Sequence, residues 1–183
     1  MHHIIRMIVY AKTKKTARKV AEVIFNEKLI PRFDYGTFFD EEDTTISGKA
    51  RWGNMPPVEL ANSKDGKALI DDGFDMIKKD FKENLENLKK ILNNYDTDEI
   101  FEGEVLDKNK QILKELEEED ETLGFHNPYW FNYLCRKISE GDWLYDNDGN
   151  PIKNSRDLKE TLNKKYCEDK DMKVWVLPVD VHT

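Results

Sequence analysis

Residues 4–28 read IIRMIVYAKTKKTARKVAEVIFNEK, and this stretch decides the fold class that the sequence predicts. Its first part, Ile4–Ala11, is almost entirely apolar and rich in β-branched residues, which is typical of a buried strand. Thr13 then offers a hydroxyl that can cap a helix. Apolar residues recur with helical spacing after it, so we expect a helix that ends near Lys28.

The middle of the chain predicts two long helices. Between Gly66 and Tyr95, apolar residues follow one another at intervals of three and four, which places them on one face of a charged helix. A second helix is expected from about Asp98 to Glu121, and the two would form a helical hairpin over residues 66–121. The same apolar stripe could instead join two copies of the chain as a coiled coil.

Three short strand segments are expected near the C-terminus, at Trp143–Tyr145, Pro151–Ile152 and Lys173–Val181. A helix beginning at Asn154 or Ser155 separates the last two, which predicts a parallel pair joined by a right-handed crossover. Pro178 cannot donate a ladder hydrogen bond, so we expect the second half of the last strand at a sheet edge or a bulge.

Length and composition fit one domain. The 183 residues are 38% hydrophobic and 36% charged, with a formal net charge of −8. A chain of this length can bury a core without disulfides. We predict a single α/β domain over residues 1–183, with a mixed α+β arrangement as the alternative. The N-terminal strand and the C-terminal strands would form a small mixed sheet, packed by the central helical hairpin.

Several classes of protein are disfavoured. No stretch approaches the roughly 20 apolar residues of a membrane span, and the start lacks the apolar region of a signal peptide. Cys135 and Cys167 have no motif spacing, so we expect free thiols in a reducing compartment. These features favour a soluble cytoplasmic protein with no membrane partner. The sequence leaves the cofactor unknown, and it contains neither a GxSxG nor an HExxH motif.

The most unusual charge pattern lies at the turn after the first strand. The first nineteen residues hold six basic side chains and no acidic one, in a protein that is acidic overall. A helix N-terminus favours anions, whereas lysines there are unfavourable for the helix itself. We therefore expect a phosphate or carboxylate to bind at the turn, although it lacks the glycines of a P-loop. The alternative is a solvated lysine face. The candidate residues are Lys12, Thr13, Lys14, Lys15 and Thr16.

A second candidate region is the segment 31–61, which shows no helical period and is rich in aromatic residues. We expect a long irregular loop here, with a short strand between Thr44 and Trp52 as an option. Its acidic run Asp40–Asp43 forms no defined cation shell. Charged and aromatic side chains on such a loop are typical of a ligand pocket or a partner surface. The alternative is that the aromatics cover the open end of the core. The candidates are Arg32, Asp34, Tyr35, Arg51 and Trp52.

A third candidate region is the last strand. Asp180 and His182 are two residues apart, so their side chains share one face and could serve as a base with its orienting carboxylate or as metal ligands. If the first and last strands are antiparallel neighbours, His2 and His3 would join His182 in a three-ligand site. If the strands are parallel, that site is excluded.

Two classes of function remain. The first is a binding or catalytic domain that takes a phosphorylated or otherwise anionic small ligand at the turn of residues 12–16, with the 31–61 loop as a lid. The second is a non-enzymatic protein-interaction module that uses the helical hairpin or the loop, with homodimer formation as one form. Nucleic acid is disfavoured as a partner except locally at the basic N-terminal end, because the rest of the chain is acidic. The aromatic patch Phe125–Tyr133 fits core packing better than base stacking. No nucleophile or base is identifiable, so the sequence leaves open whether the protein is an enzyme.

Overall fold

A computed structural model of the chain describes residues 2–39, 49–53, 55–94, 96–98, 142–163 and 171–182. Contacts group the chain into two compact units, Met1–Lys78 with Gly141–Thr183 and Lys79–Glu140. The first unit holds the sheet and the candidate sites at its two ends. That the whole chain forms one domain stays a prediction. The expected helix over 98–121, the acidic run, the aromatic patch and both cysteines lie essentially outside the described residues.

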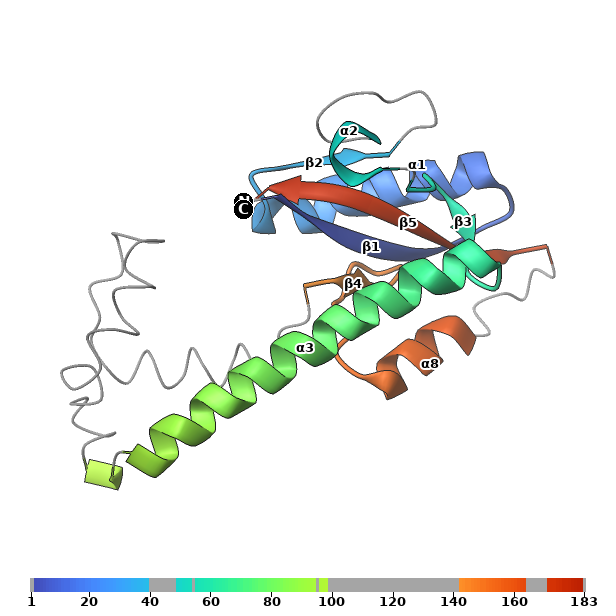
Figure 1. Cartoon of the computed structure of the whole chain (residues 1–183). Helices are drawn as coiled ribbons and strands as arrows, with labels where there is room; N and C mark the ends of the chain where they lie inside the picture. The colour runs from blue at the N-terminus through green and yellow to red at the C-terminus, as the bar shows by residue number, and fades with distance from the viewer. Residues whose placement is uncertain are drawn as a thin grey trace. The chain divides into compact units, whose positions relative to one another are not determined.

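The sheet is built on one long antiparallel pair, β1 (His2–Ala11) and β5 (Lys173–His182), which match residue for residue from His2↔His182 to Ala11↔Lys173 (Figure 1). The strand order is β2-β5-β1-β4, and β3 also pairs with β5. The short strands are β2 (Tyr35–Phe38), β3 (Glu59–Leu60) and β4 (Leu144–Tyr145). Among the described strands, β4 alone is parallel to its neighbour, β1. The predicted α/β class and the small mixed sheet made from both ends of the chain are confirmed.

The predicted parallel crossover is wrong. In the described residues β5 pairs antiparallel with β1, β2 and β3, while Pro151 makes an isolated bridge to Tyr145. The reason is length: two ten-residue apolar strands bury far more surface against each other than a two-residue segment can. Pro178 accordingly lies in a central strand, opposite Arg6. On the other side of β5 it falls between the residues paired with β3 and those paired with β2, and proline is tolerated at such a gap.

The segment 31–61 is more regular than the sequence indicates. It contributes β2 and β3 to the sheet, and residues Lys49–Trp52 form the short helix α2 where a strand had been an option. Strands of four and two residues are too short to show a hydrophobic period, and they form because β5 offers an edge. Gly36 allows β2 to approach the helix layer, because a Cβ atom there would lie 2.2 Å from the Phe25 ring.

Helix α1 (Lys14–Ile24) begins as predicted, with Thr13 as its cap. It continues through a π-helical turn at Phe25–Leu29 and a 3-10 turn at Ile30–Arg32, so Pro31 stands in the first positions of that last turn rather than beyond the helix. The helix layer therefore extends slightly further than the predicted end near Lys28.

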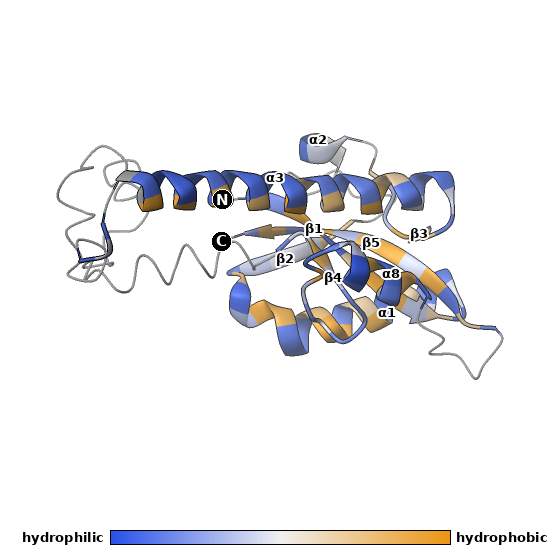
Figure 2. Cartoon of the chain, turned by 90° about the horizontal axis from the view of Figure 1, so that it is seen from below, coloured by the Kyte–Doolittle hydropathy of each residue, from blue (hydrophilic) through white to orange (hydrophobic). Residues whose placement is uncertain are grey.

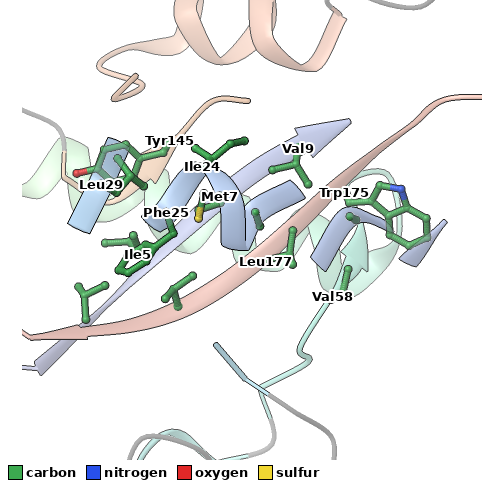
Figure 3. Packing of buried hydrophobic residues seen from close by; sticks show 14 of the residues in the cluster. Ile5, Met7, Val9, Ile24, Phe25, Leu29, Val58, Tyr145, Trp175 and Leu177 are labelled. Carbon is green, nitrogen blue, oxygen red and sulfur yellow. The ribbon is translucent and has the colours of Figure 1, made fainter. Parts of the chain in front are cut away.

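The sheet has an apolar layer on each face. Alternate residues of β1 point to opposite faces, so Ile5, Met7 and Val9 pack against α1 and its continuation, as Figure 3 shows. Ile8 and Val176 pack on the other face against helix α3 (Lys64–Asn94). Figure 2 shows α1 and α3 on opposite sides of the sheet. Helix α8 (Ser155–Asn163) adds partly buried leucines to the α3 face.

Helix α3 confirms the predicted first helix of the hairpin. Its hydrophobic residues follow one side of the rod (Figure 2), and within the first unit Ile70 and Ile77 are buried on the sheet. In the second unit Phe81 and Leu92 are 45% and 51% exposed. Within the described residues, no helix combines the length and the apolar character needed to cross a membrane.

Candidate functional site

The predicted site residues gather at the two ends of the β1/β5 pair. We call the end at Ala11 and Lys173 the lysine end, and the end at His2 and His182 the histidine end. Strand β1 runs from the histidine end to the lysine end, and both chain termini lie at the histidine end (Figure 1).

At the lysine end, residues Lys12 to Thr16 connect β1 to α1, and we call this segment the lysine turn. Each of its residues is exposed. Thr13 Oγ1 accepts a hydrogen bond from the Thr16 backbone N–H at 3.2 Å and lies 2.9 Å from Thr16 Oγ1. Both hydroxyls therefore belong to the helix cap. The first turn of α1 contains no acidic residue, so its positive end is reinforced by Lys14 and Lys15 rather than neutralised.

A cavity of about 610 Å³ opens at the same end, on the α3 face of the sheet. It lies between the start of α3, helix α8 and the start of β5. Because Lys173 lines the cavity and pairs with Ala11, the cavity begins beside the residue from which the lysine turn departs. Its walls are mainly apolar, with four polar side chains among them. The lining residues with charge or an amide are Lys67, Asp71, Lys173 and Asn62.

At the histidine end, a buried carboxylate binds a histidine. Asp180 is 0% exposed, and its Oδ1 lies 3.1 Å from His2 Nδ1. The second oxygen, Oδ2, is also buried and has no hydrogen-bond partner among the described residues. The other ring nitrogen of His2, Nε2, lies 3.0 Å from the hydroxyl of Tyr35, whose side chain is 45% exposed. These contacts link three side chains in series, from a buried carboxylate through a histidine to an accessible phenol.

A second aspartate–histidine pair stands beside the first. His182 Nδ1 lies 2.9 Å from Asp34 Oδ2, and the Asp34 backbone N–H donates to the His182 carbonyl at 2.8 Å. The Tyr35 ring stacks on His182 with centroids 5.1 Å apart and planes 1° apart. The rings of His2 and His182 meet edge to face at 4.9 Å.

The three-ligand prediction is partly corrected by this geometry. The first and last strands are antiparallel, so His2 does reach His182. His3 does not, because the next residue of a strand points to the other face, where its ring contacts Phe33 and Trp143. Burial there lowers the pKa of His3, partly opposed by the charge of Asp142. Among the described residues, no three or more His, Cys, Asp or Glu side chains are grouped so as to hold a metal ion.

The pairing of the last-strand candidates also differs from expectation. Asp180 orients His2 rather than His182, and His182 takes Asp34 instead. The structure therefore unites Asp34 and Tyr35 from the predicted loop with Asp180 and His182 from the predicted strand pair, through His2.

The remaining loop candidates lie apart from this cluster. The Arg32 guanidinium lies 3.8 Å from Asp142 and over the Tyr145 ring, beside β4. Arg51 is exposed and Trp52 half-buried on α2.

One buried charge on the sheet was not anticipated. Arg6 is 4% exposed, and burial lowers its pKa to about 10. Its guanidinium donates to the Ile4 carbonyl at 2.7 Å and to Asp72 on α3. The Nε atom is buried without a partner in the described part of the chain. Its position in a run of apolar residues was the only signal in the sequence.

The fold and its two polar ends define a small α/β protein with two separate candidate sites. The chain belongs to the family described as a domain of unknown function (DUF7995), whose model matches residues 1–117. The matched part includes His2, the lysine turn and Tyr35, whereas β5 with Asp180 and His182 follows it. No curated protein and no solved structure matches the chain.

Proposed function

We propose that this protein binds a small anionic ligand that has an apolar part, at the lysine end of the sheet. The observation that carries the proposal is the cavity of about 610 Å³ with mainly apolar walls and two lysines, Lys67 and Lys173, in its lining. Small-molecule sites usually combine apolar walls with a few polar groups that fix orientation.

The lysine turn supports the anionic part of this proposal. The turn leaves the sheet at Ala11, which pairs with cavity-lining Lys173, and Lys14 and Lys15 then begin α1. Backbone N–H groups at a helix N-terminus and nearby lysines both attract phosphate or carboxylate. In this arrangement the anionic group of the ligand binds at Lys67 and Lys173 and its apolar part enters the cavity. Lys14 and Lys15 begin the helix on the opposite face of the sheet and add electrostatic attraction around the sheet end. Leu60 and Ala61, the end of the predicted loop, form part of the wall.

The experiment is a thermal-shift series at low salt with inorganic phosphate, a nucleotide, a fatty acid and an acyl-CoA. A fatty acid or acyl-CoA at 100 times its Kd is expected to raise Tm by roughly 5–10 °C, and phosphate alone by less. The Lys67→Glu/Lys173→Glu variant is expected to lose the shift, and Lys14→Glu/Lys15→Glu to weaken it at least tenfold in Kd.

The control is Lys19→Glu/Lys153→Glu, which makes the same charge change at two exposed lysines outside the cavity lining. It should keep the shift of the wild type. An equal loss in the control, or no shift with any of the four compounds, would rule out the proposed site.

A second function, a protein-interaction module, is favoured by the exposed part of the α3 stripe. Phe81 and Leu92 stand on one helix of the second unit, about half exposed. Exposed apolar side chains in a row are typical of a partner surface or a dimer seam. Sedimentation velocity over a range of concentrations tests the homodimer: Phe81→Glu/Leu92→Glu should make a self-associating wild type monomeric, and a wild type that is monomeric throughout excludes it.

A further inference from the structure

We propose that the histidine end is a proton-transfer site in which Asp180, His2 and Tyr35 make the phenol of Tyr35 a nucleophile toward acyl, phosphoryl or sulfonyl groups. This inference concerns the end of the sheet opposite the ligand cavity and does not rest on the proposed function.

The direction of the hydrogen bonds follows from the chemistry of the three groups. An ionised carboxylate only accepts, so the proton between Asp180 and His2 belongs to Nδ1 of the imidazole. In neutral His2 the other nitrogen, Nε2, then carries a lone pair and accepts from the Tyr35 hydroxyl at 3.0 Å. His2 is thereby held in the tautomer that can take a proton from Tyr35.

The burial of Asp180 indicates that this arrangement has a use beyond packing. A buried carboxylate oxygen without a partner is costly, and such groups in native structures often mark functional sites. When His2 accepts the phenol proton, it becomes an imidazolium next to the Asp180 carboxylate, and the two opposite charges stabilise each other. The negative charge of Asp180 is therefore stabilised more strongly after the proton transfer, when the His2 ring is positively charged, than before it.

The second aspartate–histidine pair fixes the ring of Tyr35 rather than its oxygen. Tyr35 stacks flat on His182, and His182 is held by Asp34 through a side-chain and a backbone hydrogen bond. The phenol ring is thus fixed on one face while nearly half of the side chain remains accessible. Because nearly half of Tyr35 is exposed, we expect a reacting molecule to reach it without any strand moving.

The chemical step balances within these groups and the substrate. The Tyr35 oxygen forms a bond to the electrophilic centre, its O–H bond breaks, and the proton passes to His2 Nε2. The leaving group departs with its bonding electron pair and can later take the proton from His2. No oxidation or reduction occurs, and Asp180 keeps its proton count throughout.

An alternative reading is that the cluster only fastens the strand ends together. The two readings differ in the reactivity of Tyr35, and an arylsulfonyl fluoride measures it directly. Attack by the phenol gives a sulfonate ester and releases fluoride, and mass spectrometry of peptides locates the modified tyrosine.

The full-length wild type is expected to be labelled at Tyr35 at least 10 times faster than the same residue in the urea-unfolded chain. His2→Phe keeps an aromatic ring at position 2 but removes the base, so labelling should fall by roughly 10–100-fold. Asp180→Asn should reduce it by a smaller factor. Asp75→Asn is the matched control, because it makes the same substitution at an exposed aspartate of α3 outside the histidine end, and its rate should stay within threefold of the wild type.

Labelling no faster in the folded wild type than in the unfolded chain would overturn the proposal, and so would a His2→Phe rate equal to that of the wild type. Should the variants fail to fold, ¹⁵N NMR of the wild type decides. The Nδ1–H tautomer of His2 at pH 8 supports the site, and the Nε2–H tautomer overturns it.

Discussion

The two ends of the β1/β5 strand pair carry polar groups in two different arrangements. At the lysine end the polar groups are exposed side chains around a roomy apolar cavity, and Lys12 to Thr16 all face solvent. At the histidine end the polar groups touch one another at hydrogen-bond distance around Asp180, which is 0% exposed. A site that attracts a charged ligand needs charge and space, whereas a site that moves a proton needs groups held at fixed hydrogen-bond distances.

This difference determines which substitutions each end of the sheet tolerates. At the lysine end several lysines share the attraction for the ligand, so the substitution of one of them should lower the affinity only moderately. Two hydrogen bonds in series connect Asp180 to His2 and His2 to Tyr35. Both are needed to link the carboxylate to the phenol, and a small shift of β2 is expected to break the bond between His2 and Tyr35. Variants that move β2 should therefore affect the histidine end alone.

The largest effect is expected from Gly36→Ala, which tests that separation. The new Cβ would lie 2.2 Å from the Phe25 ring, a side chain that is 1% exposed and packed between Phe33 and Phe38. Overpacking of this kind costs about 1–3 kcal/mol of unfolding free energy, measurable by urea denaturation. Displacing β2 should also slow sulfonyl labelling of Tyr35, while thermal shifts from ligands at the lysine end stay unchanged.

Phe25→Leu supplies the control for this variant. The smaller side chain makes room for the new methyl group, so the double variant Phe25→Leu/Gly36→Ala should lose less stability than the sum of the two single variants. Additive losses would show that the close approach of Gly36 to Phe25 is not what holds β2 in place.

How much of this fold could be predicted depends on the length of each element. Ile4–Ala11 was predicted because it is a long, almost entirely apolar run rich in β-branched residues, and α1 and the first helix of the hairpin were predicted because each shows several helical periods. Strands β2 and β3 were missed because four and two residues show none, and they exist only because β5 has a free edge for them. The predicted parallel crossover failed for the same reason: local patterns do not show which strand a strand will choose.

The two candidate sites differ in the same way. The lysine turn is contiguous, so its charge and its place before a helix were evident in the sequence. Asp34 and Tyr35, and separately Asp180 and His182, were selected for their chemistry, but nothing local joined them. The register His2↔His182 joins them, and the sequence left that register as one of two alternatives. The cavity, with walls from α3, α8 and β5, left no signal at all.

A smaller effect is expected at the lysine end, from Lys15→Glu. The first turn of α1 has no acidic residue, so an acid at position 15 would interact favourably with the positive end of the helix. We expect a gain of about 0.3–1 kcal/mol in unfolding free energy at low salt, which disappears in ~1 M salt. Lys19→Glu makes the same charge change one helical turn later and should give no such gain. If both variants change stability equally, the lysine turn carries no cost to the helix, and its charge then gives no indication of a bound ligand.

The smallest effect is expected from the titration of His3. His3 lies among aromatic rings, whereas its neighbour His2 lies in the polar cluster on the opposite face of the sheet. Burial lowers the pKa of His3 below its ordinary value of 6.5. Below pH 6.5 the unfolded chain therefore binds a proton at this residue more readily than the folded chain does. The free energy of unfolding accordingly falls as the pH drops from 6.5 toward the folded-state pKa, and it is unaffected by His3 above pH 7.

His3→Phe preserves the edge-to-face contacts with Phe33 and Trp143 but removes the titration. Urea denaturation between pH 7.5 and pH 5 should show that the stability of the wild type falls more steeply than that of the variant. The difference isolates His3, because every other titrating group is present in both proteins. Two parallel curves would mean that His3 is hydrated when charged, and the two faces of β1 would then differ less at the histidine end than the structure indicates.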